Sequence, residues 1–229
     1  MIRRSAGICR RAAARRAHPA LGMVANFTRP ILYYVTDGSQ LLPPDMLLGR
    51  IRAAFAAGVD WVQIRERWMP TRDLCRLVEQ AATVPKKGRG RLLVNERLDI
   101  ALACGADGVH LPADSLPVDV VRRVAPPDWL VGVSCHGAAE VEAARQQGAS
   151  FAVLGPVFAT PGKGPPLGLE ALREACRLVA THRFPLLALG GISVENARAC
   201  LEAGAAGLAA IRLFQTGDVA PVVSRLRAL

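Results

Sequence analysis

The chain has 229 residues, of which 51% are hydrophobic and 21% charged, and its formal net charge is +10. This apolar fraction excludes an intrinsically disordered chain, and 21 Gly, 16 Pro and 6 Cys exclude a collagen-like or disulfide-stapled composition. No stretch approaches the roughly 18 uninterrupted apolar residues of a membrane-spanning helix, so we expect no membrane partner.

Much of the positive charge lies at the N-terminus. Residues 1–22 contain six Arg and no acidic residue, which leaves a net charge of +4 for the rest of the chain. This segment lacks the apolar run of a secretory signal, and it lacks the aromatic residues expected of an RNA-binding arm. We therefore predict a dispensable Arg-rich leader at residues 1–28, one folded domain at residues 29–229 and no nucleic-acid partner. A targeting peptide and a nucleic-acid arm are the alternatives for the leader.

The six Cys are widely spaced and form no C-x-x-C pair. This spacing argues against a zinc ribbon or a redox motif. In a chain without an export signal, it indicates reduced thiols and a cytoplasmic location.

From residue 31 onward, short apolar runs alternate with amphipathic stretches. The runs lack polar alternation, so they predict strands buried on both faces, at residues 31–36, 61–65, 92–95, 108–111, 130–134, 151–155, 186–190 and 207–211. Between them, apolar residues recur with helical spacing, for example at Leu74, Leu77 and Val78, and at Val120 and Val124. The last helix is predicted from about Asp218 to Arg227.

A glycine phrase recurs where a helix passes into a strand. It occurs at Gly58, Gly105, Gly148 and Gly204, and glycine there can adopt the left-handed conformation that ends a helix. Eight serial strand–helix units predict an α/β fold, a single (β/α)8 TIM barrel. A doubly wound open sheet is the alternative, but it would normally begin with a glycine-rich dinucleotide turn, which residues 31–38 (ILYYVTDG) lack.

In such a barrel the chemistry takes place at the carboxyl ends of the strands. The polar residues at those positions are Thr36, Asp37, Gln63, Arg65, Arg67, Asn95, Glu96, His110, Ser134, His136, Thr160, Lys163, Gly190, Gly191 and Arg212. So many basic side chains at one end predict an anionic ligand, a small-molecule phosphate.

Backbone amides at Gly190 and Gly191 can bind a phosphate, and Arg212 can contact the same phosphate. The alternative is that the two glycines only form a tight turn and that Arg212 is a solvated surface charge. The Gly/Pro-rich segment 155–166 is either a closing loop that delivers Thr160 and Lys163 or a stiff connection.

Gln63 and Arg65 alternate along one strand, so both point to the same side. Facing inward, they could bind an anion or a ring; facing the helices, Arg65 would be costly to bury unless it paired with Glu66 or Glu79. His136 is suited to proton transfer at neutral pH, with an exposed loop His as the alternative. We expect His110 to be structural, in a turn with Asp107 and Asp114.

The motifs, taken in order, resemble the thiamine-phosphate synthase/TenI family of (β/α)8 barrels over about residues 31–214. They are YYVTD (33–37), VQIRER (62–67), LVNERLDIAL (93–102), ADGVHLP (106–112), GVSCH (132–136), GPVFAT (155–160) and ALGGIS (188–193). The resemblance implies one of two activities. Synthases join a pyrimidine diphosphate to a thiazole phosphate and expel pyrophosphate with Mg²⁺, whereas some TenI-type proteins shift a proton on a thiazole phosphate carboxylate without metal.

Several positions depart from the synthase pattern. Arg67 stands where a diphosphate-binding Lys is usual, and Glu96 where a magnesium-binding Asp is usual. The second magnesium Asp falls on Ser115, with Asp114 one residue away. The loop with Thr160 and Lys163 lacks one hydroxyl, and Arg212 replaces a Ser. Losing one of two carboxylates weakens a Mg²⁺ site, because Mg²⁺ prefers carboxylate oxygens.

Three hypotheses follow from the resemblance. The first is a TenI-type tautomerase without cofactor, in which Arg65 meets the carboxylate, His136 transfers the proton, and Gly190, Gly191 and Arg212 hold the phosphate. The second is a synthase in which Glu96 and Asp114 hold Mg²⁺ and substrate binds to Gln63, Arg65, Asn95, Ser134, Thr160 and Lys163. The third is a non-catalytic barrel that binds a thiazole phosphate. The resemblance is compatible with a homo-oligomer.

Overall fold

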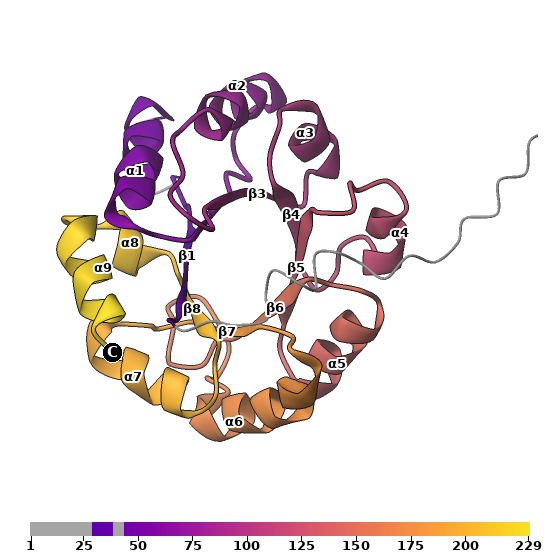
Figure 1. Cartoon of the computed structure of the whole chain (residues 1–229), viewed down its shortest axis with the longest axis vertical. Coiled ribbons are helices and arrows are strands. Elements are labelled where there is room, and N and C mark those ends of the chain that lie inside the picture. The colour runs from indigo at the N-terminus through magenta and orange to yellow at the C-terminus, as the bar shows by residue number, and fades with distance from the viewer. Residues whose placement is uncertain (1–28, 39–43) are drawn as a thin grey trace, which may run out of the picture.

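The computed structural model describes residues 29–38 and 44–229 and shows a closed barrel of eight parallel strands (Figure 1). The strands pair in sequence order, and β8 closes the barrel onto β1. Their bounds are β1 Ile31–Val35, β2 Trp61–Ile64, β3 Arg91–Asn95, β4 Gly108–Leu111, β5 Leu130–Cys135, β6 Phe151–Leu154, β7 Leu186–Leu189 and β8 Gly207–Ala210. The predicted (β/α)8 barrel is thereby confirmed.

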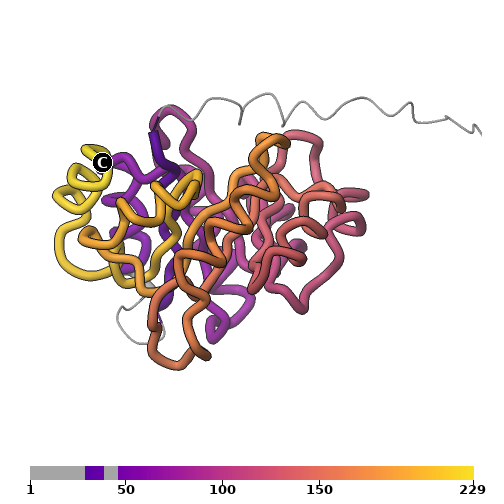
Figure 2. The backbone as a smooth tube through the Cα atoms, turned by 90° about the horizontal axis from the view of Figure 1, so that it is seen from below, coloured from indigo at the N-terminus to yellow at the C-terminus, as the bar shows by residue number. Residues whose placement is uncertain are grey.

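Helices surround the strands as an outer ring, which Figure 2 shows from the side. Their bounds are α1 Pro44–Ala57, α2 Thr71–Ala82, α3 Leu98–Ala103, α4 Val118–Arg122, α5 Ala138–Gln146, α6 Gly168–Val179, η2 Ala180–His182, α7 Val194–Glu202, α8 Arg212–Gln215 and α9 Val219–Arg227. The short helix α8 is an addition to the predicted repeat, because β8 is followed by two helices rather than one. No helix in the described part of the chain is long and apolar enough to span a membrane.

Alternation along each strand divides the core into two layers. Tyr33, Trp61 and Phe151 belong to the cluster that fills the barrel interior, whereas Tyr34 and Val62 belong to the cluster between strands and helices. Apolar residues on both faces explain the continuous apolar runs in the sequence, since each strand is covered on both sides. Residues 63 and 65 share the inward parity of Trp61, which directs Gln63 and Arg65 toward the interior and mouth.

The α4 prediction was partly wrong. Val118 and Val121 form the buried face, whereas Val120 and Val124, the positions predicted to face the core, are exposed. The helix has only five residues, and apolar spacing over so short a segment does not identify which face is buried.

Asp60 ties both ends of the domain to the amino-terminal end of the barrel. Its carboxylate is almost fully buried, accepts the Leu32 amide hydrogen and pairs with Arg89 and Arg227. Arg227 also donates to the Gly58 carbonyl oxygen, which fixes helix α9 against the start of the sheet. A buried carboxylate depends on such partners, because its loss of solvation is offset only by ion pairs and hydrogen bonds. The predicted leader, residues 1–28, lies outside the described residues.

Candidate functional site

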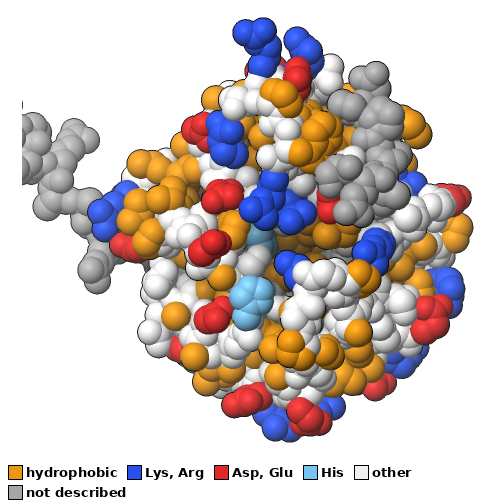
Figure 3. All heavy atoms as spheres, turned by 180° about the vertical axis from the view of Figure 1, so that it is seen from behind, with side chains coloured by type: hydrophobic (Ala, Val, Ile, Leu, Met, Phe, Trp, Pro, Cys, Tyr) orange, Lys and Arg blue, Asp and Glu red, His pale blue; other side chains and the backbone are white. Residues whose placement is uncertain are grey.

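The carboxyl ends of the strands form one face of the molecule, shown in Figure 3. This face is hollowed at its centre, where hydrophobic side chains form the floor and Lys, Arg, His, Asp and Glu side chains lie around it. The segment between β6 and α6 projects beyond the barrel at this end (Figure 2). The Lys and Arg side chains above an apolar floor suit a ligand that combines an anionic group with a flat ring.

Five polar side chains from five strands meet inside the barrel. The Tyr33 hydroxyl lies 3.0 Å from Gln63 Oε1 and 3.2 Å from His110 Nδ1. His110 Nε2 lies 2.9 Å from Ser134 Oγ, and Gln63 Nε2 donates to Asn95 Oδ1 at 2.9 Å. We call this set the internal relay. Ser134 and Asn95, its two ends, are half-buried, whereas the three central residues are buried, so only the ends reach the mouth.

The imidazole of His110 is fully enclosed. It packs against the rings of Tyr33 and Phe151, and burial lowers its pKa to about 3. Space for it exists because β5 has Gly132 beside it: a Cβ at that position would lie 2.2 Å from Phe151 Cζ and 2.8 Å from His110 Nδ1. The expected turn with Asp107 and Asp114 is wrong, since the side chain points into the barrel and Asp107 instead pairs with Lys86.

Arg65 lies at the mouth, directly after β2. Its guanidinium pairs with Asp37 at 3.7 Å, and its backbone amide donates to Thr36 Oγ1. The two charged side chains are each nearly one-third exposed, so they remain accessible to a ligand. Of the two directions that strand alternation leaves open, Arg65 takes the one toward the mouth.

Glu66 supports this arrangement from behind. It is 3% exposed and accepts hydrogen bonds from the Thr36 hydroxyl, the Gly38 amide and the Trp68 indole. Burial raises the pKa of Glu66, while these three donors act in the opposite direction. Because the donors come from the segments after β1 and β2, this carboxyl holds both strand ends together.

Arg67 and Glu96 line a small cavity of about 170 Å³ between the ends of β2 and β3, together with Asn95 and Arg97. Glu96 adopts φ 60°, and its amide donates to the His110 carbonyl oxygen. Asp114 is exposed beyond the end of β4, the neighbouring strand. The described residues contain no group of three or more His, Cys, Asp or Glu that could hold a metal ion. Two carboxylates fit Mg²⁺ only when substrate phosphates complete its coordination, a common arrangement for this ion.

The paired glycines after β7 have a steric explanation. Gly190 and Gly191 adopt φ 98° and 63°, and an added Cβ would lie 2.6 Å from Pro156 Cα and 2.7 Å from Phe158 Cβ respectively. The segment after β6 packs here, since the Phe158 amide donates to the Gly190 carbonyl oxygen. The positive φ angles and the close packing account for both glycines as a tight turn, the alternative given above. Phosphate binding by these glycines stays a prediction.

Thr160 and Lys163 lie farther along the β6–α6 connection. The Thr160 hydroxyl donates to the Phe158 carbonyl oxygen, and Lys163 is exposed. Arg212 begins helix α8 and is also exposed. The roles of Lys163 and Arg212 in phosphate binding stay predictions.

His136 is exposed just past β5. Its Nδ1 lies 2.7 Å from the Gly155 carbonyl oxygen, and its amide donates to the Glu140 carboxylate. A carbonyl oxygen only accepts, so Nδ1 carries the hydrogen in this contact. Nε2 is then left with a lone pair when the ring is neutral.

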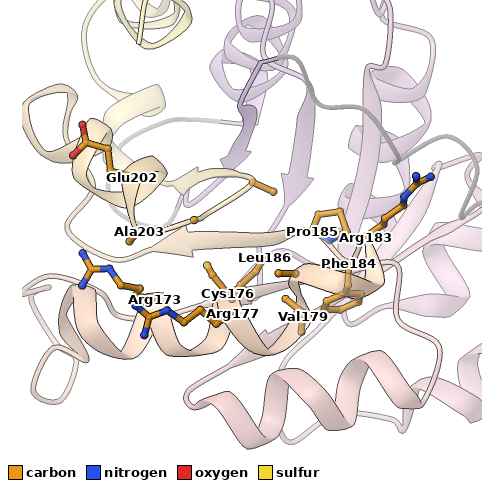
Figure 4. A pocket seen from close by; sticks show the side chains of 13 residues that line it. Arg173, Cys176, Arg177, Val179, Arg183, Phe184, Pro185, Leu186, Glu202 and Ala203 are labelled. Carbon is orange, nitrogen blue, oxygen red and sulfur yellow. The ribbon is translucent and has the colours of Figure 1, made fainter.

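A larger cavity, about 690 Å³, lies elsewhere (Figure 4). It is lined by residues of α6, the end of α7 and the beginning of β7, among them Arg177, Phe184, Leu186 and Glu202. Because it adjoins the amino-terminal end of β7, it is separate from the mouth, and none of the predicted site residues lines it.

Comparison with known proteins places this barrel in a family. Residues 32–214 match the family model described as thiamine monophosphate synthase. The chain belongs to the thiamine monophosphate synthase family. Two relatives are the thiamine-phosphate synthase of Methanoculleus marisnigri, 40% identical over 86% of this chain and 93% of the relative, and that of Chlorobium phaeovibrioides, 40% identical over 80% and 86%.

Solved structures agree with this assignment. The thiamine phosphate pyrophosphorylase from Pyrococcus furiosus matches with a TM-score of 0.75 and 30% identity, over 86% of this chain and 94% of that chain. A 3-hexulose-6-phosphate synthase matches with a TM-score of 0.62 at 20% identity and shares the fold alone.

Sequence reasoning missed three residues that shape the mouth of this thiamine monophosphate synthase family member. The sequence predicts only a strand position for Tyr33, a strand-end turn for His110, and for Glu66 an ion pair with an outward-facing Arg65. The parity of each strand carries the missing signal, because Tyr33 and Gln63 are both an even number of residues from inward-facing positions. No comparable local signal identifies Glu66, since its partners come from two different loops.

Proposed function

We propose that this chain is a thiamine-phosphate synthase, which joins a pyrimidine diphosphate to a thiazole phosphate and releases pyrophosphate. One observation carries the proposal: the relatives with that name are about 40% identical to this chain along nearly the whole barrel. The substitutions at Arg67, Glu96 and Arg212 keep the charge type or add positive charge, so they leave the mouth suited to phosphates.

In this proposal Arg65, Arg67 and Lys163 bind the diphosphate. Guanidinium groups suit this task because they donate two hydrogen bonds to one phosphate in a fixed geometry. The Asp37 carboxylate holds Arg65 in place, and Gly190, Gly191 and Arg212 bind the thiazole phosphate. The half-buried ends of the internal relay, Ser134 and Asn95, contact the ring of a bound substrate.

Mg²⁺ would be held by Glu96 and Asp114 together with the diphosphate. The ion would neutralise the charge that develops on the departing pyrophosphate. Arg67 lies beside Glu96 in the same small cavity, which puts a second positive group where that charge develops.

The test is synthesis itself. The full chain would be incubated with the hydroxymethylpyrimidine diphosphate and the thiazole phosphate, with and without Mg²⁺, and thiamine phosphate would be measured. Mg²⁺-dependent product is expected. We expect Arg67→Ala to raise the KM for the pyrimidine diphosphate by about 10- to 100-fold, the value of a hydrogen bond to a charged group. Arg72→Ala, which removes an exposed Arg from α2, is the matched control.

A second candidate is tautomerisation of a thiazole phosphate carboxylate. The specific observation in its favour is the lone pair on His136 Nε2, because a neutral imidazole in that form can accept a proton. Absence of thiamine phosphate, combined with a proton shift on the thiazole that His136→Ala abolishes, would replace the synthase proposal with this one.

A further inference from the structure

The hydrogen bonds of the internal relay all run in one direction. The Tyr33 hydroxyl has a single hydrogen, which it donates to Gln63 Oε1, an atom that can only accept. Tyr33 Oη must therefore accept from His110 Nδ1 at 3.2 Å. Burial keeps His110 neutral, so its Nε2 has no hydrogen and accepts from the Ser134 hydroxyl at 2.9 Å.

The relay continues to the end of β3. The Gln63 amide nitrogen donates to Asn95 Oδ1 at 2.9 Å. The donors thus follow one another from Ser134 to His110, Tyr33, Gln63 and finally Asn95. Each bond polarises the next in a buried chain of this kind, so all four bonds favour a common direction.

One other direction would satisfy every member. If the side-chain amides of Gln63 and Asn95 were each rotated by about 180°, Asn95 would donate to Gln63, Gln63 to Tyr33, and Tyr33 to His110 Nδ1. His110 would then carry its hydrogen on Nε2 and donate to Ser134. The position of one hydrogen on the imidazole therefore reports the direction of the whole relay.

The direction decides what the mouth offers to a ligand. With its hydrogen used on His110, the Ser134 hydroxyl presents only lone pairs. With its oxygen used by Gln63, Asn95 presents its two N–H donors. A reversed relay would offer a Ser134 hydrogen and an Asn95 oxygen instead.

We propose that Tyr33 and His110 are positioning residues that couple the hydrogen bonding of Ser134 to that of Asn95, so that the direction described here suits a flat nitrogen heterocycle whose edge directs a donor to Ser134 and an acceptor to Asn95. Neither residue needs to touch the ligand, because both act through the two ends of the relay. The identity of the ligand rests on the proposed function, whereas the direction of the relay does not.

Nitrogen NMR tests the direction without any substrate. In the full chain labelled with ¹⁵N-histidine, His110 is expected to show a protonated Nδ1 and an unprotonated Nε2. The resonances are assigned by their loss in His110→Gln. A hydrogen on Nε2 would overturn the proposal.

Tyr33→Phe tests the role of the hydroxyl. Nδ1 of His110 then has no acceptor, so we expect its hydrogen to move to Nε2, where it can bind Ser134. In the synthase assay, we expect the KM for one of the two substrates, the pyrimidine diphosphate or the thiazole phosphate, to rise about three- to tenfold, with a smaller change in kcat. This factor corresponds to the net contribution of one hydrogen bond. An unchanged tautomer together with an unchanged KM would overturn the proposal.

Tyr34→Phe is the matched control. The Tyr34 hydroxyl is buried in the layer between strands and helices and has no hydrogen-bond partner among the described residues. Its removal should leave the His110 resonances and the KM unchanged. The two proposals fail separately: a chain that makes no thiamine phosphate but shows the expected His110 tautomer would contradict only the proposed function.

Discussion

His136 donates its Nδ1 hydrogen to the carbonyl oxygen of Gly155, 2.7 Å away. This contact joins the end of β5 to the end of β6 and fixes the ring with Nε2 free. In the proposed synthase, phosphate binding and charge neutralisation perform the main work, so a side chain that transfers protons has no essential part.

We therefore expect His136→Gln to make thiamine phosphate at a rate within about tenfold of the unaltered chain. Proton transfer by a side chain is worth about 10²–10⁴-fold, so a tautomerase would lose that much. Rates of both reactions would be measured beside His182→Gln, which removes an exposed His from the amino-terminal side of β7. A loss of more than 100-fold in synthesis would make His136 a catalytic residue of the synthase.

The carboxylates of Glu96 and Asp114 are expected to matter through Mg²⁺. Glu96→Gln and Asp114→Asn should each raise the Mg²⁺ concentration needed for half-maximal synthesis by about tenfold or more, because each removes a charged ligand from an ion held by few protein groups. Titration of the rate with MgCl₂ measures this. Asp119→Asn is the control, since Asp119 is an exposed carboxylate on α4 that pairs with Arg123. Equal Mg²⁺ requirements in all four proteins would exclude the assignment.

Burial of His110 predicts acid sensitivity. Its folded-state pKa of about 3 lies below the ordinary value of about 6.5, so between these pH values the unfolded chain binds a proton that the folded chain does not. Stability from this residue is therefore complete above about pH 6.5 and is lost as pH falls toward 3, by up to about 1.4 kcal/mol per pH unit.

Urea unfolding between pH 4 and 7 measures the effect. We expect His110→Gln to show a shallower loss of unfolding free energy on acidification than the unaltered chain. His182→Gln, which also removes one His but at an exposed position, should keep the original slope. Parallel slopes for all three proteins would mean that His110 is protonated inside the barrel.

The glycines after β7 are predicted to be sterically essential. Gly190→Ala and Gly191→Ala each combine positive φ with a close contact from the segment after β6, so each should lower the free energy of unfolding by about 2–4 kcal/mol. Gly49→Ala is the control: no atom lies within 4 Å of the added Cβ inside helix α1, and we expect a gain of about 0.5–1 kcal/mol. Urea unfolding at neutral pH compares the three, and a loss below 1 kcal/mol at both positions would show that the segment after β6 can move aside.

The sequence by itself determined the barrel. Apolar runs, helical spacing and the glycine joints at Gly58, Gly105, Gly148 and Gly204 act within a few residues, so the number and order of strands and helices are readable locally. The location of the mouth follows from that order, because parallel strands direct all their carboxyl ends to one face. Strand alternation also placed Gln63 and Arg65 on one common side of the sheet.

Only the tertiary structure decided which inward residues meet. Tyr33, His110 and Ser134 come from three strands, up to about a hundred residues apart, and they touch because barrel closure and register bring them to one depth. The same is true of Glu66, whose partners belong to segments after two different strands. Contacts that depend on closure leave no periodic signal in the sequence, and so the internal relay became visible only when the eight strands were joined in space.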